Sequence, residues 1–363
     1  MPGLDAETRS MLGQTLERFL AEHYEPAHRL ARLHGHAMNY RLNWPLLAEL
    51  GVFALPFPGE LGGMDAGPVD VAYVLQLLAS GLVLEPVAEQ LVASTLLASG
   101  PPDLAQERVD AALEGKRITV VAGLSTRGLR VAQEGQQLRL EGTINVVPFG
   151  AQADEWLVVA RTSTNEARIL RIPADQPGVQ IVSFRLMDGR PAADLHFNGV
   201  TLDIGSEWIS VDETPAASKR TSDVWLLARG ADAVGVMDYT LRLTREHLRT
   251  RVQFGVAIGS FQSLQHRLSD VQMVFLEARA LLRSWAAAVD SDDETRRTPL
   301  RRALPRIVSS AGRQIGQEAI QLHGGMGVTE ELVISHCNAR LQVTATLLQD
   351  WLNHAEQPVR ETA

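Results

Sequence analysis

The segment Arg251-Val252-Gln253-Phe254-Gly255 closes one long stretch of helical periodicity, and Gln321-Leu322-His323-Gly324-Gly325-Met326-Gly327 closes another about 70 residues later. An arginine at a helix end suits an anion such as phosphate, because the guanidinium donates several hydrogen bonds in a fixed geometry. Clustered glycines let the backbone approach a ligand closely and present its N–H groups, although a glycine can also simply end a helix. The two segments are therefore the candidate ligand-binding segments of this chain.

The sequence around these segments predicts a helical bundle over residues 216–363. Apolar residues recur there every three or four positions, which is typical of helices that face a bundle core. A polar stretch, Asp290–Thr298, is expected to be a loop between two of the helices. The three apolar stripes are Val224, Leu227, Ala231, Val234, Leu241 and Leu248; Leu264, Leu268, Val271, Phe275, Ala278, Leu282, Trp285 and Val289; and Leu304, Ile307, Ala311 and Ile315.

Two other regions precede the bundle. Residues 1–116 carry helical periodicity and predict an α-helical domain, whereas residues 117–215 offer short β-type runs separated by turn residues. Regularly spaced strands without intervening helices favour an antiparallel barrel or sandwich. The candidate strands are Ile118–Ala122, Leu138–Glu141, Trp156–Ala160, Ile169–Ile172, Val179–Ser183 and Asp194–Phe197.

Composition excludes several classes of protein. The formal net charge of −9 argues against nucleic-acid binding, which needs a basic face. The single cysteine, Cys337, allows no disulfide within the chain and favours a reducing compartment. The most apolar stretch, 69–97, is interrupted by charged residues and proline, so we expect no membrane span and a cytoplasmic location. The histidines do not follow a zinc-binding pattern, and we expect no metal site.

Taken together, the two candidate segments resemble the signature of the acyl-CoA dehydrogenase family, R-x-x-F-G followed by Q-x-x-G-G-x-G. Trp44, the segment 50–56 and the segment 60–63 are similar to the family's N-terminal W…LG…P…GG pattern. The resemblance implies an α+β protein with the acyl-CoA dehydrogenase fold: an N-terminal helical domain, a middle β-domain and a C-terminal four-helix bundle. It also implies that FAD lies at a subunit interface.

The resemblance assigns roles to five residues of the two segments. Arg251 is expected to pair with the FAD pyrophosphate, and Phe254 to pack on the cofactor. Gln321, Gly324 and Gly325 are expected to line the adenine side. An acyl-CoA is the implied substrate, and electron-transfer flavoprotein is a possible electron acceptor.

The sequence departs from the family where the catalytic base should be. Removal of the α-proton of the substrate requires a carboxylate, and the family's E-G-T triplet falls by spacing on Leu348-Gln349-Asp350. A second family location, 222–230, also lacks glutamate: Asp223 is present, but leucine stands at 226 where an arginine is usual. Asp350 is the remaining candidate base within the chain, and a surface aspartate is the simpler explanation of it.

Two flavin-side segments of the middle domain also differ from the family. The T-E-P-G-x-G-S-D-type loop is replaced by Ala122-Gly123-Leu124-Ser125-Thr126-Arg127-Gly128, and the W-[IV]-T-N segment by Asn145-Val146-Val147-Pro148. The chain thus resembles the smaller subunits of α2β2 heterotetrameric members, which act in steroid side-chain and dicarboxylyl-CoA degradation and include the small subunit of pimeloyl-CoA dehydrogenase. A partner would supply the glutamate. A self-sufficient homo-oligomeric dehydrogenase with a relocated base and a cofactor-free scaffold subunit are the alternatives.

Overall fold

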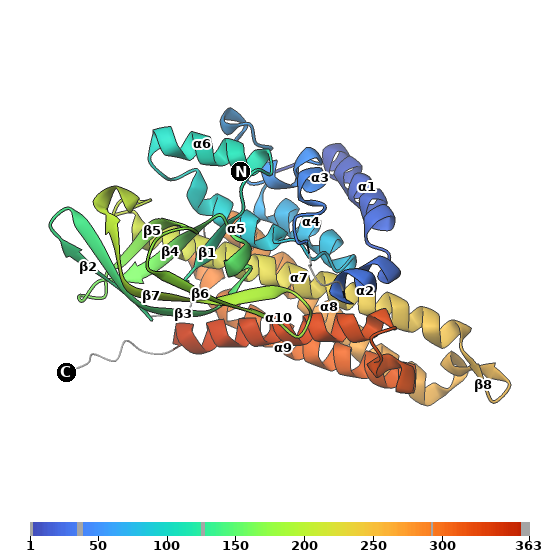
Figure 1. The fold of residues 1–363 in the computed structure, drawn as a ribbon. Helices are drawn as coiled ribbons and strands as arrows, with labels where there is room; N and C mark the ends of the chain where they lie inside the picture. Colours follow the sequence, from blue (N-terminus) through green and yellow to red (C-terminus); the bar gives the residue numbers. More distant parts are fainter. Residues whose placement is uncertain (1–2, 35–38, 125–127, 292, 357–363) are drawn as a thin grey trace. The chain divides into compact units, whose positions relative to one another are not determined.

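The computed structural model describes residues 3–34, 39–124, 128–291 and 293–356 (Figure 1). Within them the chain divides into two compact units. The sheet unit comprises residues 3–4, 39–67 and 84–225, and the helical unit comprises 5–34, 68–83 and 226–356. This division follows packing rather than chain order, so the domain bounds 1–116, 117–215 and 216–363 stay a prediction.

The sheet unit contains one seven-stranded sheet and three helices. The strands run in the order β1-β4-β2-β3-β7-β6, and β5 pairs with β4 outside this path. The strands are β1 (Thr119–Ala122), β2 (Leu129–Glu134), β3 (Gln137–Pro148), β4 (Glu155–Arg161), β5 (Ala167–Pro173), β6 (Val179–Arg185) and β7 (Pro191–Asp203). The helices are α3 (Trp44–Glu49), α5 (Val87–Leu97) and α6 (Pro102–Leu113), with 3-10 turns η1 (Val52–Ala54), η2 (Gly59–Leu61), η3 (Gly150–Gln152) and η4 (Ile204–Ser206).

The six predicted β-runs are confirmed as β1 and β3–β7, and most neighbours pair antiparallel as expected. The sheet is nevertheless mixed, because β1 pairs with β4 in parallel, from Thr119 opposite Glu155 to Ala122 opposite Val158. The sequence did not predict this pairing, since turn signals identify hairpins between consecutive strands only. It also missed β2, in which only Leu129 and Val131 are buried and the other four residues are exposed.

Buried tryptophans anchor the core of the sheet unit. Trp156 on β4 and Trp208 are 0% and 2% exposed, and each indole N–H donates a 2.9 Å hydrogen bond to a backbone carbonyl, of Gly150 and Leu96 respectively. The N–H of a buried tryptophan usually finds such an acceptor. These contacts fix α5 and η3 to the rest of the unit.

The helical unit is built on four long helices, which confirms the predicted C-terminal bundle (Figure 1). The four helices are α7 (Thr214–Thr250), of which residues from Leu226 onward belong to the unit, α8 (Gln262–Asp290), α9 (Glu294–His323) and α10 (Val333–Glu356). Three further helices belong to the unit: α1 (Ala6–His23), α2 (Pro26–His34) and α4 (Pro68–Ser80). No helix in the described part of the chain combines the length and the apolar character needed to cross a membrane.

The expected loop Asp290–Thr298 is shorter in the structure. The helix α8 extends to Asp290, and α9 begins at Glu294 because the Asp293 side chain caps it, accepting hydrogen bonds from the N–H groups of Thr295 and Arg296. An acidic N-cap of this kind is a strong helix start. The polar character of the stretch therefore reflects an exposed first turn rather than a loop.

A buried ion pair ties α7 to α10. The Nη2 of Arg340 lies 2.6 Å from Oδ1 of Asp232, and the Thr344 hydroxyl donates to Oδ2 of the same aspartate at 3.0 Å. All three residues are almost fully buried. Because a buried carboxylate is tolerated only when it is paired and hydrogen-bonded, this triad fixes the register of the two helices.

Candidate functional site

A short hairpin follows α7 and carries the first candidate segment. Val252–Gln253 (β8) pairs with Val256–Ala257 (β9), and Phe254 and Gly255 form the two-residue turn, with φ values of 54° and 81°. Positive φ at both turn positions is the geometry of tight β-hairpins, and it is unfavourable for phenylalanine. The Arg251 carbonyl accepts the Ile258 N–H at 2.9 Å, so Arg251 lies at the base of the hairpin.

The hairpin tip exposes apolar side chains. Phe254 is 90% and Val252 62% exposed, and the only ring contact recorded for Phe254 among the described residues is an edge-on contact with Phe261, at a centroid distance of 6.2 Å. Figure 1 shows the hairpin, labelled β8, projecting from the end of α7. Exposed apolar clusters of this kind mark binding surfaces rather than stable free surface.

The second candidate segment forms a sharp turn at the end of α9. Gly324 has φ 66° and ψ −151°, a combination that essentially only glycine adopts, and its N–H donates to the Gln321 carbonyl. A Cβ added at Gly324 or Gly325 would meet no atom within 4 Å, whereas at Gly327 it would lie 2.6 Å from the Ile320 carbonyl oxygen. The first two glycines thus leave open space beside the backbone, and the third is required by packing in the turn η6 (Gly324–Val328).

Two stacked imidazoles bring the segments together. The rings of His247, on the last turn of α7, and His323, at the end of α9, lie 4.3 Å apart between centroids at an interplanar angle of 27°. His323 is buried, and its Nδ1 donates to the Ala319 carbonyl at 2.8 Å. The sequence prediction missed this stack, and its only signal was the placement of His247 four residues before Arg251.

The environment of the stack disfavours the protonated form of both imidazoles. Burial lowers the pKa of His247, and the charges of His323 and Arg251 lower it further. Burial also lowers the pKa of His323, against the opposing effect of the hydrogen bond to Ala319. Among His247, His323 and Arg251, the positive charge at neutral pH therefore resides on Arg251, which is exposed.

Comparison with known proteins gives this geometry a family. Residues 6–116 match the acyl-CoA dehydrogenase N-terminal domain, and residues 227–347 match the acyl-CoA dehydrogenase C-terminal domain. Acyl-CoA dehydrogenase FadE27 of Mycobacterium tuberculosis is 31% identical over 302 residues, 78% of each chain. Acyl-CoA dehydrogenase IpdE2 of the same organism is 30% identical over 327 residues, 90% of this chain and 88% of that protein.

The chain belongs to the acyl-CoA dehydrogenase family. The ChsE4-ChsE5 complex from Mycobacterium tuberculosis contains a chain similar in structure, with a TM-score of 0.84 and 25% identity over 99% of this chain and 100% of that one. Butyryl-CoA dehydrogenase from Megasphaera elsdenii has a TM-score of 0.83 at 18% identity over 98% and 99% of the two chains, which supports the fold. The protein is thus an oxidoreductase of a family that depends on FAD.

Asp350, the candidate base, lies away from the two segments. It is exposed on α10, where the His354 Nδ1 lies 3.5 Å from its carboxylate oxygen Oδ1. Its position is about 25 Å along the helix axis from Val333, at a rise of 1.5 Å per residue, while the glycine turn precedes the start of the same helix. The structure therefore does not bring Asp350 together with Arg251 or Gln321, and a catalytic role for Asp350 stays a prediction.

The position that spacing assigns to the family's glutamate falls within α10. Leu348 is 0% exposed, and the helix continues unbroken through Gln349 and Asp350 to Glu356. Glycine in the family's triplet would disfavour a helix, whereas glutamine propagates it well. At the second family location, Asp223 and Leu226 are both buried. Neither location offers an exposed carboxylate in place of the glutamate.

The flavin-side segments are only partly described. The strand β1 ends at Ala122, and residues 125–127 of the replaced loop lie outside the described residues. The segment 145–148 belongs to β3, where Val146 has φ 53° and interrupts the pairing with β7. Its N–H donates to the Asp194 carboxylate at 2.8 Å. This bulge is a local feature of the sheet, held by the Asp194 carboxylate.

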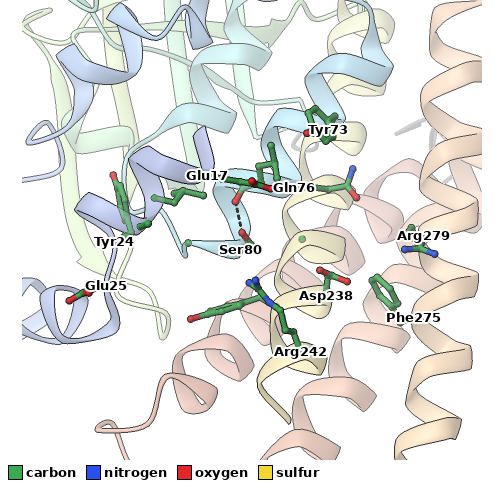
Figure 2. A pocket seen from close by; sticks show the side chains of 16 residues that line it. Glu17, Tyr24, Glu25, Tyr73, Gln76, Ser80, Asp238, Arg242, Phe275 and Arg279 are labelled. Carbon is green, nitrogen blue, oxygen red and sulfur yellow. Dashed lines mark hydrogen bonds between the residues drawn. The ribbon is translucent and has the colours of Figure 1, made fainter. Parts of the chain in front are cut away.

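A cavity of about 820 Å³ lies between α1, α4, α7 and α8 of the helical unit (Figure 2). Its lining mixes the carboxylates of Glu17 and Asp238 with the guanidinium groups of Arg242 and Arg279. Each arginine lies over an aromatic ring at 5.1 Å, that of Tyr239 for Arg242 and that of Phe275 for Arg279. A third carboxylate, that of Glu25, also lines the cavity, which contains none of the predicted site residues. The described residues also include no group of three metal-binding side chains.

Proposed function

We propose that this chain is one subunit of an FAD-dependent acyl-CoA dehydrogenase, that it provides the half-site for the pyrophosphate and adenine of FAD, and that a partner chain supplies the catalytic glutamate. One observation carries the proposal. The hairpin of Arg251 and the turn of Gly324 meet through the His247–His323 stack, whereas Leu348, the residue that spacing assigns to the family's glutamate, is a buried leucine.

The residues present fit the cofactor they would hold. The Arg251 guanidinium would donate to the pyrophosphate, and the open space beside Gly324 and Gly325 would let a planar adenine approach the backbone. Gln321 is exposed and can hydrogen-bond a heterocycle edge, while Phe254 would cover it. FAD, when bound, supplies the acceptor for the hydride that leaves Cβ of the acyl thioester.

The apolar hairpin tip supports a partner subunit. An exposed phenylalanine with neighbouring valines is stabilised when another chain covers it. The absence of a glutamate at the expected positions gives the same partner a chemical role. Removal of the α-proton needs a carboxylate that has a suitable pKa and lies within hydrogen-bond reach of that proton. Structural similarity to a chain of the two-component ChsE4-ChsE5 complex also supports a heteromer. An α2β2 heterotetramer in the cytoplasm, a steroid side-chain or dicarboxylyl acyl group and electron-transfer flavoprotein as acceptor complete the proposal.

Two measurements test the proposal: the flavin content per chain and the bleaching of the flavin absorbance by acyl-CoA. Both are made on the chain alone and on the chain co-expressed with a candidate partner subunit. We expect flavin and activity only in the mixture, at about one FAD per pair of unlike chains. One FAD per chain with bleaching in the isolated protein would instead support a self-sufficient homo-oligomer. A stable mixture without flavin would support the cofactor-free scaffold.

A further inference from the structure

The stacked imidazoles of His247 and His323 have no role in the half-site as described so far. Each histidine is mechanically linked to one of the two segments. The His247 carbonyl accepts the Arg251 N–H at 2.9 Å, and His323 directly precedes Gly324 in the chain. The backbone at each ring therefore adjoins a segment that carries a proposed ligand contact.

We propose that the ring stack of His247 and His323 is a clasp that positions the Arg251 hairpin and the Gly324 turn relative to each other, so that both can contact one ligand. The two residues are positioning residues and touch no reacting atom. The proposal about the ligand rests on the proposed function, whereas the proposal about the clasp does not.

Three features of the geometry support the clasp. The ring centroids lie 4.3 Å apart at an interplanar angle of 27°, so the two imidazoles are in close, stacked contact. His323 is 7% exposed and anchored through Nδ1 to the Ala319 carbonyl, so it is the fixed half of the pair. His247 is partly exposed at the end of α7, where helices fray, and is the half that the contact restrains.

The charges around the stack make its strength depend on pH. Arg251 and His323 are the charged or titratable groups that act on His247, and both disfavour its protonated form. His323 is disfavoured as a cation by burial. Because both histidines have a lower pKa in the folded protein than the ordinary 6.5, the unfolded chain binds more protons below pH 6.5. The clasp is therefore fully stable above pH 6.5 and is weakened as the pH falls below it.

Hydrogen exchange of the purified complex tests the clasp without reference to flavin. Four proteins are compared: wild type, His247→Ala, His247→Phe, which keeps an aromatic ring, and the control His266→Ala, an exposed histidine on α8. We expect His247→Ala to speed exchange in residues 247–258, which the contact with the anchored His323 restrains, and His247→Phe and His266→Ala to leave exchange in residues 247–258 unchanged. Unchanged exchange in residues 247–258 of His247→Ala would overturn the clasp.

Flavin affinity and pH complete the test. We expect His247→Ala to weaken FAD binding about tenfold and His247→Phe by less than about threefold, as the loss of one ring contact implies. If exchange rises but FAD affinity is unchanged, the clasp stands and the proposed FAD half-site is wrong. Between pH 7.5 and pH 5.5 the melting temperature of the wild type should fall about 2 °C more than that of His247→Phe. Equal falls would overturn the pH dependence of the clasp.

Discussion

The hairpin end of the helical unit and the middle of α10 differ in how far their sequences favour stability. At the hairpin end, Phe254 has a positive φ and is 90% exposed, and Gly324 adopts a conformation that other residues avoid. Around Leu348 the helix is regular and its apolar residue is fully buried. Strain and exposed apolar surface persist where a ligand or partner compensates for them.

Under the proposed function, this difference separates binding from catalysis within one chain. The hairpin end has features that lower stability, as the proposal expects of a surface that binds a ligand. The middle of α10 has the properties of an ordinary core helix. Its continuous backbone contains no loop, and its buried position at Leu348 would disfavour a charged glutamate. Substitutions in the two regions should therefore affect different quantities, flavin binding in one and folding stability in the other.

Leu348→Glu should give the largest effect, on folding. A carboxylate placed at a site with 0% exposure lacks a partner, and we expect the free energy of unfolding to fall by about 3–5 kcal/mol. Chemical denaturation measures the loss, and Leu348→Met, which keeps the volume, should lose less than about 1.5 kcal/mol. We expect no acyl-CoA dehydrogenation from Leu348→Glu alone, since the flavin-side loop also differs; measurable turnover would show that α10 can open into a catalytic loop.

Arg251→Ala should weaken FAD binding in the assembled complex by about 2 kcal/mol, or roughly thirtyfold, because it removes charge-assisted hydrogen bonds to a phosphate. The fold should be retained, since the residue is exposed. Fluorescence titration of the flavin-depleted complex measures the affinity. Arg249→Ala, an exposed arginine two residues earlier, is the matched control, and an equal loss in both variants would point to general charge rather than a specific contact.

Gly324→Ala and Gly325→Ala should separate backbone strain from ligand space. Alanine at 324 must adopt φ 66° and ψ −151°, so we expect a loss of stability on the order of 1–3 kcal/mol. Gly325 has no positive φ and open space beside it, so alanine there should change stability by less than about 0.5 kcal/mol while lowering flavin content. Thermal unfolding and flavin absorbance measure the two effects. Normal flavin content in Gly325→Ala would place the adenine elsewhere.

Much of the fold could be predicted from the sequence, because periodicity reports burial directly. In the α8 stripe, Val271, Phe275 and Trp285 are buried as predicted, whereas Leu264 and Leu268 are only half-buried near the start of the helix. The parallel pairing of β1 with β4 could not be predicted, since it depends on contacts between strands distant in sequence.

The candidate site was predictable in its parts and not in its assembly. Glycine clusters and an arginine at a helix end are local signals, and the structure places both at one end of the bundle. The His247–His323 stack is a tertiary contact, and neither residue shows it alone. The prediction of a loop over Asp290–Thr298 was too long. The Asp293 side chain caps α9, so the polar residues that follow it form the first turn of a helix.

Asp350→Asn should give the smallest effect and bears directly on where the base resides. Asp350 is exposed, and its recorded partner, His354, lies four residues along the same helix, so loss of the charge should change stability by less than about 0.5 kcal/mol. If a partner supplies the base, kcat of the complex should also remain within about twofold. A general base contributes at least about a hundredfold to a proton transfer, so a loss of that size with unchanged flavin content would locate the base on this chain. The measurement thus decides whether the middle of α10 is only a structural helix or also faces the substrate.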